Sequence, residues 1–203
     1  MSQCAATVAP LPRLRYGGTM TDPRFDTIAA LITRFGAQRY GEDVTQIDHV
    51  LQCGRLAIEA GEDDAVIVAA LLHDIGQFID DAGAMAETVA HDAQHEALGA
   101  QFLSRWFGPE VTEPVRLHVA AKRYLCATVP GYAEALSGAS KLSLTLQGGA
   151  MAAPEIADFA ANPWFEQAVR LRHYDDAGKR VGWIVPDLAS HHDRIVGAMR
   201  QAG

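Results

Sequence analysis

The chain is short of cysteine, and this excludes two kinds of site. Its 203 residues hold three cysteines, Cys4, Cys53 and Cys126, and no two of them have the CxxC spacing. An odd number of cysteines without that spacing argues against a disulfide framework and against a zinc site built from thiolates. The cysteine content fits the cytoplasm, where thiols stay reduced.

Positive charge and long apolar runs are scarce as well. The 17 basic residues face 25 acidic ones, the net charge is −8, and no basic run exceeds two residues. We therefore expect neither nucleic acid nor a membrane surface as partner, but a small molecule. No window approaches about 18 apolar residues, and the first residues lack the pattern of a signal peptide.

Residues 1–22 have no periodicity and carry Pro10, Pro12 and two adjacent glycines. This composition is typical of a flexible tail, and Met20 is a possible native start. The remaining residues, 23–203, are enough for one domain with a large core, so a second domain is not needed.

Apolar residues recur at helical spacing along the whole of that domain. The pattern predicts an all-α bundle of about eight to nine helices with no alternating strand pattern. Asp22 with Pro23 and Thr45 are expected to start two of the helices, and the segment "DDAVIVAALLHDIG" is apolar all round, as a central buried helix would be. Residues 132–149 are expected to form one helical segment, and after it a break at Asn162-Pro163 separates a short helix from a longer one.

Four histidines indicate a metal site. His49, His73, His95 and His118 each lie inside an apolar helical pattern, and successive members are separated by 24, 22 and 23 positions. Helices of a bundle can each project one side chain into a shared interior, which is how helical metalloproteins bind their ions. Any one of these histidines alone would more often be an ordinary core residue.

Asp74 follows His73 directly, so its side chain points about 100° away from that of His73 on a helix. A carboxylate has two oxygens and can bridge two cations. Taken alone, Asp74 could equally cap the segment that begins at Ile75. The buried motif "LLHDIG" with histidines on later helices favours a metal ligand.

The other histidines fit less well. His91 precedes His95 by four residues, but "HDAQH" lacks the glutamate of a metalloprotease helix, so we expect His91 at a helix start or in a loop. His191 and His192 are expected at the surface. Asp175 or Asp176 would lie at the end of an amphipathic helix.

These features together resemble the HD-domain superfamily, whose all-α fold holds one or two metals. More narrowly, the chain resembles the mixed-valent diiron oxygenases of phosphonate catabolism, typified by PhnZ and TmpB and distantly related to myo-inositol oxygenase. The resemblance covers about residues 39–187, and "HVAAKRYL" with "LQGGAM" is more specific than the HD pair itself.

The resemblance implies two iron ions, Fe(II) and Fe(III), with Asp74 as the bridge between them. One ion would be held by His49, His73, Asp74 and Asp175, and the other by Asp74, His95 and His118. Mixed imidazole and carboxylate ligands suit iron, although the same ligands also accept Mn or Zn. The implied reaction uses O₂ to cleave the C–P bond of a 1-hydroxyphosphonate with a 2-amino or 2-trimethylammonio group, releasing phosphate and glycine or glycine betaine.

Candidate substrate contacts follow from the same resemblance. Lys122 lies one helical turn after His118 and, with Arg172, would bind the phosphonate. Ser140, Ser143 and Gln147 are weaker candidates. Tyr40 would occupy the O₂ site until substrate binds, and Glu42 would recognise a cationic amine. Gln77 stands where the family has a histidine, which points to a difference at the amine end of the pocket.

Two other functions remain open from the residues alone. A metal-dependent HD phosphohydrolase acting on a nucleotide or phosphate ester needs similar ligands and often a further acidic residue, for which Asp80 and Asp81 are candidates. A non-catalytic HD module would have degenerate ligands, whereas all six are present here.

Overall fold

The computed structural model describes residues 15–16, 19–20, 22–39, 42–81 and 94–201. Within these ranges the chain forms ten α-helices and two 3-10 helices, which confirms the all-α prediction. The elements are α1 (Pro23–Phe35), α2 (Gln46–Glu59), α3 (Asp64–Leu72), η1 (Ile75–Asp81), α5 (His95–Leu103), α6 (Pro109–Thr128), α7 (Tyr132–Ala135), α8 (Gly138–Leu146), α9 (Ala153–Ala160), α10 (Phe165–Ala177), η2 (Leu188–His191) and α11 (His192–Gly197).

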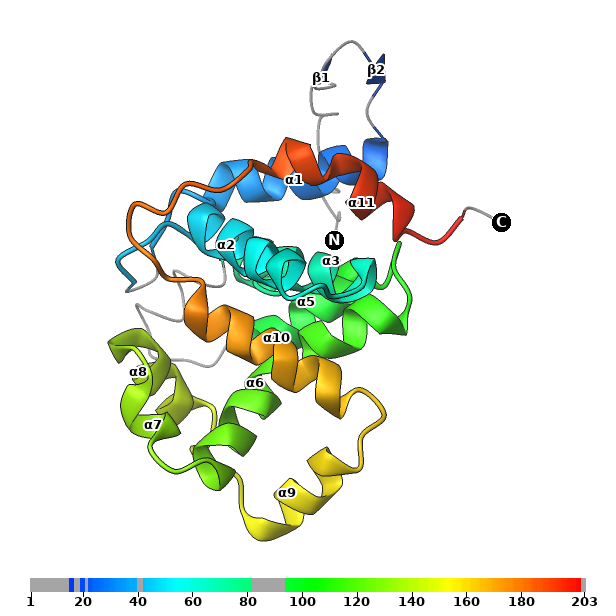
Figure 1. The fold of residues 1–203 in the computed structure, drawn as a ribbon. Coiled ribbons are helices and arrows are strands. Elements are labelled where there is room, and N and C mark those ends of the chain that lie inside the picture. The colour runs from blue at the N-terminus through cyan, green and yellow to red at the C-terminus, as the bar shows by residue number, and fades with distance from the viewer. Residues whose placement is uncertain (1–14, 17–18, 21, 40–41, 82–93, 202–203) are drawn as a thin grey trace, which may run out of the picture.

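Two very short strands, β1 (Arg15–Tyr16) and β2 (Thr19–Met20), pair antiparallel in the segment before α1. No strand was expected there, because a two-residue pairing leaves no alternating pattern to detect. These strands lie outside the helical bundle (Figure 1), so the fold class is unaffected.

The expected helix starts are present. The Asp22 carboxylate accepts from the backbone N–H of Arg24, with Pro23 at the first position of α1, and Thr45 caps α2 through the N–H of Asp48. Each cap satisfies an amide that the first turn of a helix leaves without a partner. The start of each helix is therefore encoded locally.

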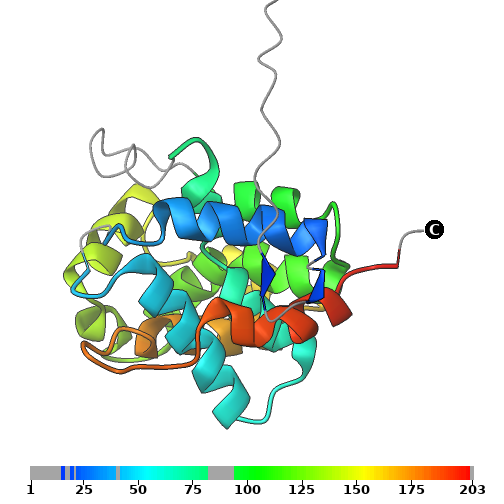
Figure 2. The same ribbon diagram turned by 90° about the horizontal axis from the view of Figure 1, so that it is seen from above.

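Helix α3 is the centre of the bundle. Its residues Val66 to Leu72 are all buried, and it contacts α2, α6, α10 and α11. Helices α1 and α11 pack together at one end of the molecule, and α9 lies at the opposite end (Figure 1). Helices α7 and α8 (yellow-green) and helix α11 (red) lie toward opposite sides of the molecule (Figure 2). Helices α6 and α10 make the most extensive contact among the described elements, and α10 also packs against α2, so segments far apart in sequence meet in the middle.

The structure has more helices than expected because residues 132–149, predicted as one segment, form α7 and α8. Leu136 is extended at the end of α7, and Ser137 caps α8 by accepting from the N–H of Ser140. A serine cap inside an apolar pattern separates two helices without a proline or a glycine run.

The surface placement of His191 was wrong. Its exposed fraction is 4%, and neither ring nitrogen has a hydrogen-bond partner among the described residues. Leu188, His191, Ile195 and Met199 follow at helical spacing and are all buried, so the imidazole replaces an apolar side chain in that row. His192 is half-buried, and its ring packs edge-to-face with that of Phe25, with the ring centroids 4.7 Å apart.

Among the described residues, no helix combines the length and the apolar character of a membrane span.

Candidate metal centre

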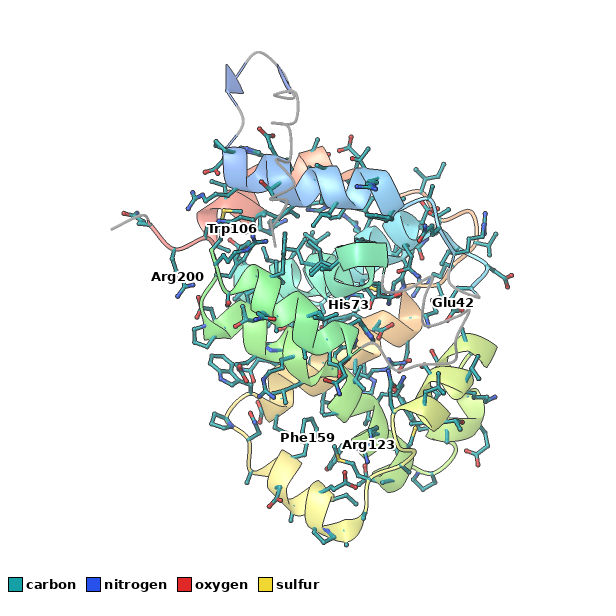
Figure 3. All side chains as sticks on the ribbon, turned by 180° about the vertical axis from the view of Figure 1, so that it is seen from behind. Glu42, His73, Trp106, Arg123, Phe159 and Arg200 are labelled. Carbon is teal, nitrogen blue, oxygen red and sulfur yellow. The ribbon has the colours of Figure 1, made fainter. Side chains whose placement is uncertain are left out.

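Five elements bring six ligand-type side chains into the interior. His49 comes from α2, His118 from α6 and Asp175 from the last turn of α10, while His95 is the first residue of α5. Helix α3 ends at Leu72 with His73 as its C-cap, so Asp74 lies in the turn that leads into η1. Figure 3 shows His73 in the middle of the bundle. All except the half-buried His95 are buried.

One cluster, called here the first donor group, consists of His49, His73 and Asp175 with one oxygen of Asp74. The Nε2 atoms of His49 and His73 are 3.2 Å apart, and His49 Nε2 lies 3.3 Å from Asp175 Oδ1. Asp74 Oδ2 is 3.7 Å from His49 Nε2 and 3.6 Å from His73 Nε2. Ligand atoms about 2.1 Å from one ion lie roughly 3.0–3.4 Å from their neighbours, so these separations are close to those of a shared ion.

The second donor group consists of His95, His118 and the other oxygen of Asp74. His95 Nε2 and His118 Nε2 are 3.1 Å apart, and Asp74 Oδ1 lies 3.4 Å from the former and 4.0 Å from the latter. The two oxygens of Asp74 are therefore directed to two different pairs of histidines. This is the arrangement of a bridging carboxylate.

Backbone carbonyls fix the orientation of three of the histidine rings. The Nδ1 atoms of His49, His73 and His118 lie 2.9, 2.9 and 2.7 Å from the carbonyl oxygens of Gly178, Ala70 and Val115. A carbonyl only accepts, so Nδ1 must donate, and in the neutral ring Nε2 then keeps its lone pair. Metal-binding histidines are commonly oriented in this way.

This assignment tests whether a cation fits. As neutral rings with their protons on Nδ1, His49 and His73 direct two Nε2 lone pairs at each other across 3.2 Å. Two acceptors at that distance repel each other unless a positive charge lies between them. The residues therefore fit a metal ion in the first donor group, and the carboxylate with two imidazoles in the second fits another.

Burial favours the neutral ring of His49, but Cys53 and Asp175 outweigh it and raise the pKa of this imidazole, so a cation in the first donor group takes the place of the proton that the ring otherwise holds. The protonation of His118 and Asp74 agrees directly with metal binding. Burial, together with the neighbouring His95 and His73, lowers the pKa of His118 to about 3, so its imidazole is neutral and able to bind metal. Burial works against the charged form of Asp74, but His73, His95 and His49 outweigh it and hold the pKa of this carboxyl well below its usual range. Asp74 therefore stays ionised.

Cys53 also lies beside the first donor group, one helical turn after His49. Its Sγ is 3.9 Å from His49 Nε2, but its S–H donates to the carbonyl of Tyr174 at 3.3 Å, and burial raises the pKa of the thiol. Asp175 is closer to His49, and against the effect of burial Arg172 and His49 hold the pKa of its carboxyl well below the usual range, so the carboxylate fits a cation at this position better than the thiol does. The i, i+4 spacing to His49 was a usable sequence signal for Cys53.

Lys122 is a buried cation beside the centre. Its Nζ donates to Ser143 Oγ at 2.7 Å, and among the described residues no carboxylate lies within ion-pair distance of it. Burial lowers the pKa of Lys122 to about 8, and Arg172 and Lys179 add to the effect. A buried ammonium without a counter-ion favours the binding of an anion.

Arg172 faces the first donor group through Asp175. Its guanidinium binds Asp175 Oδ2 at 2.7 Å, the Asp176 carboxylate and the Tyr132 hydroxyl. Asp175 Oδ1 remains directed at His49. Arg172 thus holds the Asp175 carboxylate of the first donor group in this orientation. Asp176 and Tyr132 were not among the predicted site residues, because their roles depend on this contact.

A second polar cluster, the Glu42 cluster, joins α8 to the chain after α10. Glu42 Oε1 accepts from Lys179 Nζ and from Ser137 Oγ, both at 2.7 Å, and Lys179 Nζ also donates to Ser140 Oγ at 3.1 Å. Glu42 is labelled in Figure 3 and lies away from His73, toward α8. Lys179 was not predicted, since a lysine in the turn "DDAGKR" looks like ordinary surface charge.

The remaining predicted residues are placed as follows. The amide oxygen of Gln147, at the end of α8, is buried without a hydrogen-bond partner among the described residues. Gln77 is half-buried in η1, and its backbone N–H donates to the carbonyl of Asp74. Tyr40 and His91 lie outside the described residues, as do the side chains of Asp80 and Asp81.

Gly76 lets the two metal-binding segments approach each other. A Cβ at this position would lie 1.9 Å from the carbonyl oxygen of His95 and 2.7 Å from the backbone nitrogen of Gly99. Only glycine allows η1 and α5 to pack this closely. The contact sets the distance between Asp74 and His95.

The chain is similar to known proteins over most of its length. Residues 47–139 match the HD domain family. The chain is 45% identical over 173 residues, 85% of its length and 86% of the relative, to hydroxymethylphosphonate dioxygenase of Gimesia maris. It is also 45% identical over 161 residues, 79% of its length and 82% of the relative, to the glycine-betaine-forming [1-hydroxy-2-(trimethylamino)ethyl]phosphonate dioxygenase of Leisingera caerulea. The chain belongs to the HD-domain family of phosphonate dioxygenases.

Proposed function

We propose that this protein is an O₂-dependent oxygenase that binds two iron ions and cleaves the C–P bond of a 1-hydroxyphosphonate. The observation that carries the metal assignment is Asp74, whose two oxygens face two separate pairs of histidines. The chemistry rests on the two relatives whose names are those of phosphonate dioxygenases.

Iron bound at the two donor groups would supply the redox chemistry that O₂ requires, as Fe(II) and Fe(III) together. The side chains around it have other tasks. Lys122 supplies positive charge for the phosphonate, and Ser143 holds the ammonium in place. Arg172 keeps Asp175 directed at His49 and can offer its remaining N–H groups to the substrate. The burial of these groups keeps water from the charges that bind substrate.

The overall reaction converts a 1-hydroxyphosphonate and O₂ into inorganic phosphate and the carboxylic acid of the same carbon chain. With a 2-amino group the acid is glycine, and with a 2-trimethylammonio group it is glycine betaine. The resemblance favours these two substituents, and Glu42, Gln77 and Tyr40 are the proposed contacts at that end of the substrate, with Tyr40 as the gate for O₂.

The test combines metal analysis with turnover. We expect two irons per chain, an EPR signal of a mixed-valent pair after partial oxidation, and phosphate release from 1-hydroxy-2-aminoethylphosphonate or its trimethylammonio analogue that requires O₂. Phosphate release that persists without O₂, or a site that retains only Mg or Zn, would instead support a metal-dependent phosphohydrolase.

A further inference from the structure

The charges around the metal centre are almost all paired within the protein. Arg172 is bound by Asp175 and Asp176, and Lys179 is bound by Glu42. Among the described residues at the centre, Lys122 is the cation with no carboxylate partner, and every described carboxylate there faces a histidine, an arginine or a lysine. The part of the centre that the structure describes thus offers an unpaired positive charge but no unpaired negative one.

Lys179 is held firmly in its pair. Its Nζ donates to Glu42 and to Ser140, and its side chain is only 18% exposed, against 16% for Glu42. Charge-assisted hydrogen bonds of this length between half-buried groups are strong. Glu42 accepts a second hydrogen bond from Ser137, so its Oε1 atom accepts from both Lys179 and Ser137.

Lys179 is also close to the metal ligands. It follows Gly178, whose carbonyl orients His49, and its charge helps to lower the pKa of Asp175. Gln52 on α2 fixes the same stretch of chain by accepting from the backbone N–H of Arg180 and donating to its carbonyl. Lys179 therefore lies next to the first donor group, and hydrogen bonds of its two chain neighbours, Gly178 and Arg180, hold this segment against α2, the helix that carries His49.

We propose that Lys179 is a specificity-determining residue that competes with a cationic substrate substituent for Glu42. This rests on the proposed function. Two carbon atoms separate a 2-ammonio nitrogen from phosphorus, so a substrate bound at the metal brings its cation into the same region. That cation competes with the Lys179 ammonium for the negative charge of Glu42, while a substrate without a cationic substituent leaves the ion pair intact.

The test compares two substrates, hydroxymethylphosphonate and 1-hydroxy-2-(trimethylammonio)ethylphosphonate. The measured quantity is the ratio of kcat/KM for the substrate with the trimethylammonio group to kcat/KM for hydroxymethylphosphonate, which has no cationic substituent. Lys179→Met keeps the apolar stem but frees the Glu42 carboxylate, and we expect it to raise the ratio about tenfold, the effect of one charge interaction of about 1.4 kcal/mol. The double variant Lys179→Met/Glu42→Gln should return the ratio to near the wild-type value.

Lys141→Met is the matched control. Lys141 lies on α8 beside Ser140, is exposed, and donates to the backbone carbonyl of Glu134, so its removal should leave the ratio unchanged. A Lys179→Met ratio within twofold of the wild type, or a lower one, would overturn the proposal. So would a rise that persists in the double variant.

Binding without turnover separates this proposal from the proposed function. Calorimetry of the iron-loaded proteins under anaerobic conditions measures the affinities for both phosphonates. If the wild type releases phosphate from neither substrate, the proposed reaction fails, but the affinity ratio still decides the role of Lys179. If Lys179→Met does not fold, Lys179→Gln gives the same comparison, since it also removes the charge.

Discussion

His95 and His91 allow the ligand set to be tested one residue at a time. His95 belongs to the second donor group alone, so His95→Ala should reduce the iron content from two ions per chain to one and abolish phosphate release. His91→Ala should retain both irons. Equal iron loss in the two variants, measured by elemental analysis, would contradict the choice of His95 over His91.

Lys122 gives the activity a pH dependence. Its pKa of about 8 means that the ammonium form, which binds the phosphonate, is lost as the pH rises through 8. We therefore expect kcat/KM to fall by about tenfold per pH unit above that point, because each unit removes nine-tenths of the charged form.

Lys122→Arg is the informative comparison, because a guanidinium stays charged over the whole range. The descending limb of its pH profile should move to higher pH, even if its maximum is lower. If wild type and Lys122→Arg descend at the same pH, another group controls the profile.

Individual residues also show what a sequence can reveal. Their regular separation and the apolar helical pattern around each one predicted that the four histidines meet in the interior. The structure brings their Nε2 atoms together in two pairs. Lys179 was missed because its partner Glu42 lies 137 residues away. Local patterns carry no information about such a pair. His191 was misplaced although its spacing to Leu188 and Ile195 was visible.

At the scale of elements, the contact of η1 with α5 depends on Gly76. Gly76→Ala places a methyl group into the backbone of α5. Overpacking of this kind costs about 1–3 kcal/mol, so the melting temperature should fall. The same shift separates Asp74 from His95, and iron at the second donor group should be lost first.

Gly197→Ala is the control for that experiment. Gly197 ends α11 and is exposed, and nothing lies within 4 Å of an added Cβ. Alanine is the better helix former, so this variant should be neutral or slightly more stable. A Gly76→Ala protein with unchanged melting temperature and two irons would show that the close approach is not required.

Most elements were predictable because their ends are encoded locally. Asp22, Thr45 and the Asn162-Pro163 break mark helix boundaries that the structure confirms. The division of residues 132–149 was not predicted, since it depends on Ser137, which also binds Glu42. Its position reflects a tertiary contact as well as a helix cap.

At the scale of the whole molecule, the metal centre ties together α2, α3, α5, α6 and α10. Without cations, buried lone pairs and carboxylates face one another across these helices. Anaerobic removal of iron with a chelator should therefore lower the melting temperature, and re-addition of Fe(II) should restore it. Metal at 1,000 times its dissociation constant adds about 4 kcal/mol to the free energy of unfolding.

Asp74→Asn provides the control for that measurement. It keeps the shape of the bridge but removes its charge, so its melting temperature should respond little to iron. A wild-type protein with the same melting temperature before and after chelation would show that the centre contributes nothing to the stability of the bundle.

The order of the residues along the chain separates the two donor groups during synthesis. The ligands of the second donor group all lie between residues 74 and 118, whereas the first donor group begins at His49 and needs Asp175. A chain that has left the ribosome as far as the end of α6 already carries every ligand of one group. The other stays incomplete until α10 emerges. Asp74 therefore belongs both to the donor group whose residues are all synthesised early and to the one that is complete only after α10 has been synthesised.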